Sequence, residues 1–461
     1  MSQQLSPAGA AGQVPDDGQP DNIYLSGPIL PLFLKTALPI VLVMMVNGLF
    51  SVVDAYFLGV YVGKDAVVAV TLMFPLYMML VALSTLVSSG FSSVYARQIG
   101  AGDKAEAQQV FTSAIQLSLL VCAVLIFSFW ALGPQLSLWV ANGSQLLADL
   151  GRGYIAILIF CSPLVFVLGI NSDALRAEGL LQAMVAISLS SAILHIAFDW
   201  LFVVQLQWGV NGSAYGPVLS HVCALAALLG YRSLSGNGPR SLTVALRPKH
   251  WPALLALGTP SGLSYIGFAI SAAVTLYALQ LWAGDQFEAS SGALGIMTRL
   301  TTFTYLPLLG LSFAFQTIVG NNFGAGQLDR ARSTTKLAVA VAFGYCVTVQ
   351  VGFLIASPWL GGVFVTDSAI QHELARILPI TTLTLFIFGP QMMVARYFQA
   401  IGDARRAALL TLTRAFVFGI PLTLALPYLI GEPGIWYAGP LAESLLLALT
   451  VGVLIRLRKG S

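Results

Sequence analysis

Twelve apolar stretches, each long enough to cross a lipid bilayer, constrain this chain more than any other feature of its sequence. A transmembrane helix needs about 20 predominantly apolar residues. Only 9% of the 461 residues are charged, whereas a soluble domain has about 25%. The chain is therefore predicted to be an all-α membrane protein with twelve transmembrane helices, over 36–62, 67–96, 107–132, 152–175, 182–206, 210–231, 253–283, 290–319, 334–357, 375–399, 407–430 and 434–456.

The basic residues predict how these helices are oriented, because cytoplasmic loops and helix ends collect lysine and arginine. With twelve helices, both termini and the even-numbered loops lie on one side of the membrane. That side holds 18 of the 22 basic residues; Lys64, Arg152 and Arg376 lie on the other side, and Arg299 lies inside a helix. We expect a multi-pass protein of the bacterial inner membrane with both termini in the cytoplasm.

Several classes of protein are excluded by composition and motifs. The net charge of +3 is small and the basic residues are scattered, so nucleic-acid binding is not expected. The four cysteines lie far apart in apolar stretches, which argues against a metal site or a disulfide built on them. No DDxxD-type carboxylate cluster and no catalytic soluble loop is present in the sequence. We therefore expect no enzyme activity and no cofactor.

An internal repeat divides the chain into two halves. Four pairs of segments match in order at an offset of 221–224 residues: Pro39 with Pro260, 100–103 (GAGD) with 324–327 (GAGQ), 176–179 (RAEG) with 399–402 (QAIG), and the Gly-Pro pair at 216–217 with that at 439–440. Each half holds six helices. Both halves then enter the membrane in the same direction, related by a pseudo-two-fold axis along the membrane normal.

This repeat predicts the organisation of the whole chain. The first residues are rich in Pro, Gly, Gln and Asp, contain no basic residue and lack an apolar core, which is typical of disorder and not of a signal peptide. The predicted parts are a disordered N-terminal tail (1–27), an N-lobe (28–231), a basic cytoplasmic linker (232–252), a C-lobe (253–457) and a cytoplasmic tail (458–461).

Together with the repeat, five motifs resemble the multidrug and toxic compound extrusion (MATE) family over about residues 30–457. They are Leu38-Pro39, 54–59 (DAYFLG), 96–103 (ARQIGAGD), 175–179 (LRAEG) and 398–402 (FQAIG). The resemblance implies an antiporter that expels amphipathic, often cationic, organic compounds as protons or sodium ions return. The predicted helices 7 and 10 contain no acidic residue, which is similar to the DinF-like branch, with its acidic centre in the first lobe.

Two carboxylates inside the predicted membrane segments are the main candidates for the coupling site. Inserting an ionisable side chain at mid-bilayer costs about 2.5–3.5 kcal/mol on insertion scales, so such a residue is by default a candidate for a functional role. Asp54 and Asp199 lie at similar depth in the first lobe, and the positions that match them in the second half are Thr275 and Pro421. Burial and like charge make such a pair hold a proton more readily.

Polar neighbours on the same helices complete the predicted coupling site. Asn47 and Ser51 share a helix face with Asp54, because the three residues are spaced i, i+4, i+7. Asn211 and Tyr215 reach the same level from the next helix. The alternative for both aspartates is a carboxylate that only bonds neighbouring helices together.

His195 lies four residues before Asp199, where the MATE family usually has asparagine. The change removes an amide oxygen that could coordinate sodium and supplies a group that titrates near neutral pH. It favours protons over sodium as the coupling ion. The other interpretation, a hydrogen-bonded packing histidine, stays open.

Five further residues are candidates for the substrate cavity or for gating. Pro39 interrupts the backbone hydrogen bonds of its helix, and the resemblance implies that this helix bends there; a fixed kink is the alternative. Met73 and Tyr77 belong to an aromatic, Met-rich stretch that could line an adaptable cavity or pack against lipid. Arg299 and Glu443 lie at similar depth in the second lobe, where they could form an ion pair, or Glu443 could contact a cationic substrate.

The sequence thus predicts a cation-coupled, preferably H⁺-coupled, antiporter that exports amphipathic or cationic organic compounds by alternating access. Its expected partners are small-molecule substrates and the lipid bilayer, and a monomer is expected. The alternative is a lipid-linked oligosaccharide or lipid flippase of the same superfamily. Such a flippase would be expected to carry several basic residues in its cavity to hold a pyrophosphate. Arg299 is the only basic residue that we expect inside the membrane.

Overall fold

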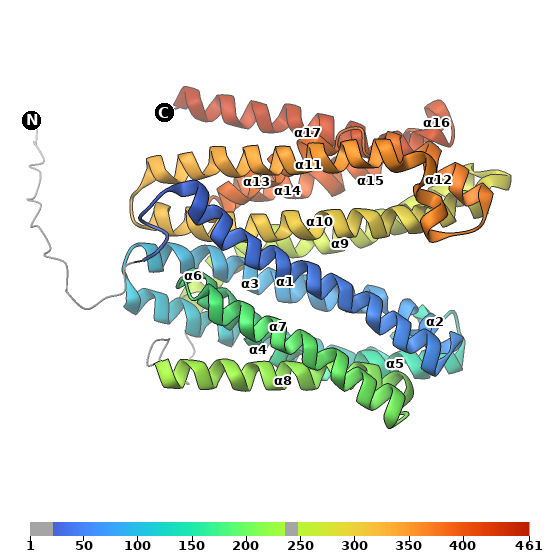
Figure 1. Ribbon diagram of the computed structural model, residues 1–461, viewed down its shortest axis with the longest axis horizontal. Helices are drawn as coiled ribbons and strands as arrows, with labels where there is room; N and C mark the ends of the chain where they lie inside the picture. Colours follow the sequence, from blue (N-terminus) through green and yellow to red (C-terminus); the bar gives the residue numbers. More distant parts are fainter. Residues whose placement is uncertain (1–21, 236–247, 461) are drawn as a thin grey trace, which may run out of the picture.

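The computed structural model describes residues 22–235 and 248–460 (Figure 1). In these ranges the chain forms long helices joined by short turns, without a strand. Ten helices are long and apolar enough to cross a membrane, and two further pairs are each bent at a short break. Counting each bent pair as one span gives twelve, which confirms the predicted number of crossings.

The six spans of the N-lobe are α1 (Ile29–Phe57) with the π-helical turn η1 (Leu58–Val62), α2 (Lys64–Leu72) with α3 (Phe74–Gly100), α4 (Lys104–Val140), α5 (Gln145–Phe160) with α6 (Ser162–Ala177), α7 (Leu181–Asp199) with the π-helical turn η2 (Trp200–Gln205), and α8 (Gly209–Ser235). The six spans of the C-lobe are η3 (Pro248–His250) with α9 (Trp251–Trp282), η4 (Gly284–Gln286) with α10 (Phe287–Gly324), α11 (Leu328–Phe364), α12 (Ser368–Thr381) with α13 (Leu385–Ala400), α14 (Ala404–Leu412) with η5 (Thr413–Gly419), α15 (Ile420–Ala425) and α16 (Pro427–Ile430), and α17 (Pro433–Gly460).

Several helices are longer than their apolar stretches predict. The helix α4 has 37 residues and α10 has 38, so each is about 55 Å long, against about 30 Å of hydrocarbon. The hydropathy of the sequence marks only the part inside the lipid. Polar ends that continue the helix beyond it, such as the segment from Lys104 to Glu106, carry no apolar signal.

The two halves share their irregularities, as a structural repeat requires. The fourth span is bent by 46° and the tenth by 50°, at Cys161 and Thr382, which lie 221 residues apart as the repeat predicts. The turns after α3 and α10 both contain a glycine at φ +74°, Gly102 and Gly326. A residue with positive φ commonly ends a helix, and glycine adopts this conformation at the lowest cost. This explains the second glycine of each GAG motif.

We call the side of the molecule that holds residue 22 and the C-terminal end of α17 the terminus side; it is on the left in Figure 1. The first glycines of the two GAG motifs bring the lobes together there. A Cβ at Gly100 of α3 would overlap the Asn321 carbonyl of α10, and a Cβ at Gly324 of α10 would overlap the Arg97 carbonyl of α3. Small residues permit such close helix approach in membrane proteins.

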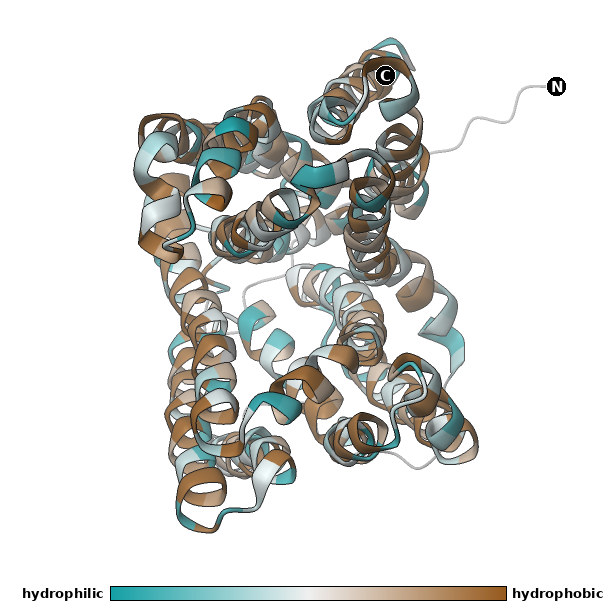
Figure 2. Ribbon diagram, turned by 90° about the vertical axis from the view of Figure 1, so that its right-hand side faces the viewer, coloured by the Kyte–Doolittle hydropathy of each residue, from teal (hydrophilic) through white to brown (hydrophobic). Residues whose placement is uncertain are grey.

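A shared hydrophobic core and buried polar bonds also join the lobes toward the terminus side. Phe33 of α1 and Leu175 of α6 belong to the same buried cluster as Phe315 of α10. Arg176 of α6 donates from Nε to Thr317 of α10 at 3.0 Å, across the lobes. A second bond, from a terminal nitrogen of Arg176 to Ser92 of α3 at 2.7 Å, lies within the N-lobe and holds the guanidinium in place. The ribbons of the two lobes diverge toward the opposite side, and Figure 2, seen from that side, shows them as two groups of helices.

The end of the predicted disordered tail is ordered, so that prediction is wrong for residues 22–27. Tyr24 is fully buried, and its hydroxyl donates to the Arg176 carbonyl of the N-lobe at 2.5 Å. Burial raises the pKa of this hydroxyl, so it remains a donor. Asn322 and Arg330 of the C-lobe donate to the Tyr24 carbonyl at 3.1 Å and 3.3 Å. The buried ring and these bonds hold the segment, which we call the N-terminal strap (residues 22–27), across both lobes.

Two other boundaries differ from the prediction. The linker predicted over 232–252 is shorter, because α8 continues to Ser235 and helical structure resumes at Pro248; residues 236–247 lie outside the described residues. The predicted C-terminal tail, 458–461, is helical up to Gly460. The ends of α8 and α17 are rich in basic residues, so the apolar stretches in the sequence stop before the helices do. Residues 1–21 of the predicted tail also lie outside the described part of the chain.

Candidate functional site

Two neighbouring helices of the N-lobe carry the candidate site. Asp54 lies in the last turn of α1, just before η1. His195 and Asp199 lie one turn apart on α7, and Asp199 ends that helix where η2 begins. The helices α1 and α7 pack against each other. Residues i and i+4 share a helix face, so both α7 side chains point toward α1.

The three side chains converge on one point. His195 Nε2 lies 3.3 Å from Asp54 Oδ1 and 3.3 Å from Asp199 Oδ2. The structure thus brings Asp54, His195 and Asp199 together as one cluster, which we call the triad; its role in coupling stays a prediction. The His195 ring also lies beside Phe50, with ring centroids 6.0 Å apart.

Asp199 is the most enclosed member of the triad. Its side chain is 1% exposed, compared with 16% for His195 and 26% for Asp54. With both carboxylates ionised, the Asp199 oxygens and His195 Nε2 have no hydrogen-bond partner among the described residues; a proton held between Asp54 and Asp199 would join the two carboxyl groups by a hydrogen bond. Buried polar atoms are normally paired. The triad is therefore arranged around a shared point rather than as a closed hydrogen-bond network.

Gly216 of α8 makes room for the Asp199 carboxylate. A Cβ at this position would overlap Asp199 Oδ1 and would lie 3.2 Å from the Asp199 backbone nitrogen. The widened turn η2, directly after Asp199, is of the kind often found at functional sites. In the sequence Gly216 marks only the internal repeat; its contact with Asp199 depends on how α7 and α8 pack and carries no sequence signal.

The other predicted members of the coupling site lie elsewhere or cannot be placed. Asn47 is exposed, two turns before Asp54. The Asn211 side chain lies against Gly153 of α5, and the exposed Tyr215 ring packs edge-on against Trp208 at 5.8 Å. In the described part of the chain, no hydrogen bond joins these residues to the triad. The Ser51 side chain lies outside the described residues.

The prediction that Met73 lines a cavity is wrong. Met73 is fully buried within an N-lobe cluster that includes Leu80 and Ile155. A Cβ at Gly151 of α5 would lie 2.7 Å from Met73 Cγ, so the methionine fills the space that this glycine leaves. Met73 also marks the break between α2 and α3, just before Pro75, because proline disrupts the helix on its N-terminal side.

Tyr77, Pro39 and Arg299 lie where a role in the cavity or in gating stays a prediction. Tyr77 is 39% exposed, one turn into α3. Pro39 lies inside the continuous helix α1. Arg299 is exposed on α10 and makes no ion pair or hydrogen bond with any described residue.

The expected ion pair between Arg299 and Glu443 is wrong, because Glu443 pairs with another arginine. Arg414 of η5 lies 2.5 Å from Glu443 Oε1, and its guanidinium stacks on the Phe388 ring at 3.7 Å. The Gln391 amide donates to the Glu443 backbone carbonyl at 3.2 Å. The distribution of basic residues predicts that Arg414 lies on the cytoplasmic side, but it lies ten residues into the eleventh span. A carboxylate within the membrane is a natural partner for an arginine at that depth.

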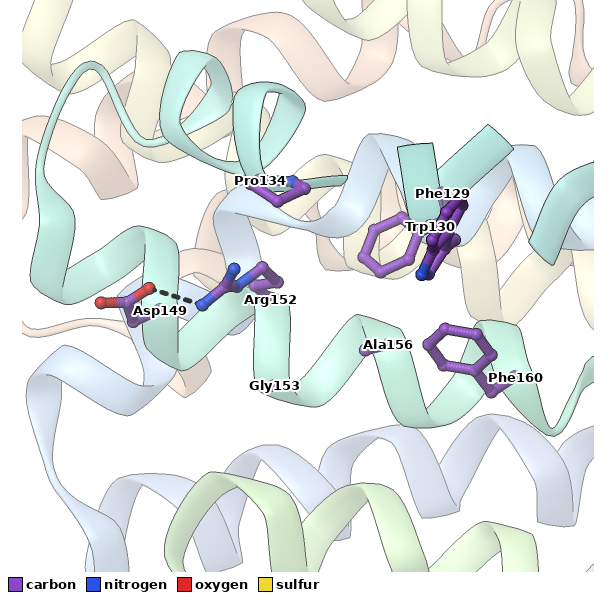
Figure 3. A pocket seen from close by; sticks show the side chains of 8 residues that line it. All are labelled: Phe129, Trp130, Pro134, Asp149, Arg152, Gly153, Ala156 and Phe160. Carbon is purple, nitrogen blue, oxygen red and sulfur yellow. Dashed lines mark hydrogen bonds and ion pairs between the residues drawn. The ribbon is translucent and has the colours of Figure 1, made fainter. Parts of the chain in front are cut away.

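A pocket lies between α4 and α5, on a different part of the N-lobe (Figure 3). It has a volume of about 290 Å³ and is lined mainly by apolar side chains, including Phe129, Trp130 and Phe160. Trp130 is 71% exposed, as a lipid-facing residue is. Asp149 and Arg152 pair with each other at one edge, 3.0 Å apart, so the pocket offers no free charge to a ligand.

Comparison with known proteins identifies the family. The family model MatE matches residues 39–201 and 260–424, two segments that begin 221 residues apart, as the internal repeat does. The multidrug export protein MepA of Staphylococcus aureus (strain bovine RF122 / ET3-1) is 23% identical over 440 residues, which cover 94% of this chain and 95% of MepA. MepA of Staphylococcus haemolyticus (strain JCSC1435) is 23% identical over 441 residues, covering 93% and 94%.

Solved structures share the fold. A structure described as the outward-facing conformation of a multidrug resistance MATE family transporter superposes with a TM-score of 0.86 at 22% identity and covers 96% of this chain and 98% of that chain. A MOP superfamily transporter from Pyrococcus furiosus Vc1 (DSM3638) gives 0.86 at 21% identity with the same coverage. The two-lobed arrangement of twelve spans is therefore the MATE fold. The chain belongs to the MatE family, whose members are ion-coupled multi-pass membrane transporters of small molecules and not enzymes.

Proposed function

We propose that this protein is a proton-coupled antiporter that exports amphipathic or cationic organic compounds by alternating access. The single observation that carries the proposal is the convergence of Asp54, His195 and Asp199 in the N-lobe. The relatives named multidrug export proteins support the substrate class. We further propose that it is a monomer of the bacterial inner membrane with both termini in the cytoplasm; the bacterial relatives support the location, and the distribution of the basic residues supports the orientation.

The chemistry of the triad favours protons over sodium. Two carboxylates in a desolvated site repel each other, and each is costly to keep charged. Uptake of a proton relieves both costs, and the imidazole of His195 is a third acceptor within 3.3 Å of each carboxylate. Sodium prefers oxygen ligands, as hard cations do, and His195 removes the amide oxygen that the family usually offers at this position.

The position of the triad supports its coupling to alternating access. The helix α1 carries Asp54 near one end, and it also packs along α10 of the C-lobe. A Cβ at Gly310 of α10 would lie 2.9 Å from the Val41 Cα of α1, so the two helix backbones are in close contact there. A change in charge at the triad that shifts α1 against α7 would therefore reach the contact between the lobes.

The flippase alternative receives no support from the basic residues, although more of them lie inside spans than expected. Besides Arg299, Arg396 of α13 and Arg414 of η5 lie within spans. Arg396 donates to Gln399 at 2.7 Å and to Ser261 at 3.1 Å, and Arg414 pairs with Glu443. Each of these two guanidiniums has its partners within the protein, so they do not form a free basic cluster for a pyrophosphate.

The proposal is tested in inverted vesicles that contain the protein at matched levels. Wild type is expected to release protons from the acidified lumen when ethidium is added, and Asp54→Asn is expected to lose this response, because asparagine cannot carry a proton. Asp149→Asn, which alters an exposed carboxylate paired with Arg152, serves as the control and should respond like wild type. An unchanged response in Asp54→Asn would refute the role of the triad. Replacing sodium by choline should leave the wild-type response intact; its collapse would make sodium the coupling ion.

A further inference from the structure

We infer that the triad is also a binding site for a first-row divalent transition-metal ion, represented here by Zn²⁺. Asp54, His195 and Asp199 each present one ligand atom, and these atoms all lie within 4.8 Å of one another. The three ligands come from two helices that pack together, so no loop has to close to assemble them.

The spacing of the ligand atoms suits such an ion. Zinc bonds to imidazole nitrogen and carboxylate oxygen are about 2.0–2.2 Å long, and at a tetrahedral angle they place neighbouring ligand atoms about 3.3–3.6 Å apart. His195 Nε2 lies 3.3 Å from an oxygen of Asp54 and 3.3 Å from an oxygen of Asp199. Two of the three edges of the ligand triangle therefore already have the length that coordination requires.

The unpaired atoms of the triad point to a missing partner. Asp199 is 99% buried, and when both carboxylates are ionised neither its oxygens nor His195 Nε2 has a hydrogen-bond partner among the described residues; a proton shared by Asp54 and Asp199 would still leave His195 Nε2 unpaired. Leaving such buried atoms unpaired is costly. A cation at the shared point would satisfy the Asp199 carboxylate and the imidazole at once, which a hydrogen bond between any two of them would not.

The donor set and the charge select the class of ion. Imidazole nitrogen suits zinc, copper, iron and nickel, whereas magnesium and calcium prefer oxygen ligands only. Two carboxylates and a neutral imidazole carry a charge of −2, so a divalent ion makes the cluster neutral. That matters inside a membrane, where each uncompensated charge is costly. The Asp54 side chain is 26% exposed, so the protein does not enclose the triad completely.

The functional consequence rests on the proposed function. An ion held by Asp54, His195 and Asp199 together would occupy the place of the coupling cation and keep both carboxylates engaged, so exchange would stop. Zn²⁺ is therefore expected to inhibit transport at concentrations at which Mg²⁺ has no effect.

Binding is tested directly on the purified full-length protein with Co²⁺ as a spectroscopic substitute for Zn²⁺, after removal of any affinity tag. We expect one Co²⁺ per protein, with the visible absorption of a tetrahedral or five-coordinate ion, displaced by Zn²⁺ and not by Mg²⁺. His195→Asn and Asp199→Asn should each weaken binding by more than about tenfold. His221→Gln, which alters a histidine of α8 outside the triad, should bind Co²⁺ like wild type.

The outcomes separate the metal site from the proposed function. Absence of saturable Co²⁺ binding to wild type, or equal binding to His195→Asn, overturns the metal site, whatever the transport assay shows. Should a variant aggregate, the rise in melting temperature that Zn²⁺ produces in wild type provides the second measurement, and an equal rise with Mg²⁺ would likewise overturn the inference. Binding lost in His195→Asn together with transport that ignores Zn²⁺ supports the metal site and counts against the triad as the coupling site.

Discussion

Single residues decide whether the site can exist, and Gly216 shows this most clearly. Because Gly216 has no side chain, the surface of α8 leaves space there for the Asp199 carboxylate. The methyl group of an alanine at this position would overlap the carboxylate. The buried carboxylate can therefore lie against the backbone of a neighbouring helix, away from lipid. The same argument applies at Met73, which fills the space that Gly151 leaves open.

Gly216→Ala is expected to weaken proton coupling more than it weakens folding. Overpacking in a well-packed interior costs about 1–3 kcal/mol, and here the cost is relieved most directly by displacing Asp199 from His195. Substrate-induced proton release should fall several-fold while the protein still inserts. Gly230→Ala, on the same helix but with open space at the added carbon, is the control. Wild-type proton release in Gly216→Ala would show that the contact is irrelevant to coupling.

At the residue scale, the sequence predicted the members of the triad but not its surroundings. Asp54 and Asp199 stood out because charge is rare in the spans, and His195 stood out by its i, i+4 spacing to Asp199. Partners across helices cannot be predicted in this way, since they depend on helix rotation and tilt. Depth alone offers Arg299 as one possible partner of Glu443, which pairs with Arg414 in the structure. Depth is also the sole reason for including Asn211 and Tyr215 in the predicted site.

At the scale of elements, the N-terminal strap is the feature that sequence patterns hid. The strap follows a stretch rich in Pro, Gly, Gln and Asp, a composition typical of disorder, yet its own Tyr24 supplies a buried ring and its backbone carbonyls supply acceptors. Arg330 of α11 donates to the Gly27 carbonyl at 2.7 Å and to the Ser26 carbonyl at 2.6 Å. One arginine from the C-lobe thus holds a segment that also bonds to the N-lobe.

Arg330→Gln is expected to loosen the strap and to favour conformations that open on the terminus side. A bond from a charged group is worth about 1.5–3 kcal/mol, and less at the exposed Ser26 and Gly27 carbonyls, where water can replace the lost donor. Hydrogen exchange of residues 22–27 should speed up markedly, because their acceptors lose a donor that ties them to α11. Arg332→Gln, an exposed neighbour that pairs with Asp329 at 3.2 Å, provides the comparison. Equal exchange in the two variants would show that Arg330 does not hold the strap.

The helices themselves were predicted better than their ends. Twelve apolar stretches give twelve spans because the bilayer imposes a length on each. The ends of α4 and α10 extend into water, where hydrophobicity no longer reports on structure. The bends in the fourth and tenth spans escaped prediction because a break of a few residues leaves the apolar run intact.

At the scale of the whole molecule, two glycines related by the repeat control how closely the lobes meet. Gly100 and Gly324 lie at equivalent positions where α3 crosses α10. At each glycine, a backbone carbonyl of the other helix occupies the space that a side chain would need. An even number of spans per half relates the lobes by an axis along the membrane normal. The closed terminus side is thus a property of the repeat and not of one helix.

Gly324→Ala is expected to open the terminus side, because the added carbon collides with the backbone of Arg97. In a variant without the four native cysteines, a cysteine at Ser261, which is buried and faces Ser89 across the lobes, should react faster with maleimide. Gly344→Ala, with open space around the added carbon, should react as slowly as the parent. Unchanged labelling in Gly324→Ala would mean that this crossing does not hold the lobes together.

The central claim, that protons reach the triad and drive export, is tested most directly by uphill transport in sodium-free proteoliposomes. A pH gradient alone should make the wild-type protein concentrate ethidium against its gradient. Asp54→Asn and Asp199→Asn should still exchange ethidium downhill but should not concentrate it. Accumulation by either variant, or accumulation by wild type only when a sodium gradient is imposed, would contradict the account.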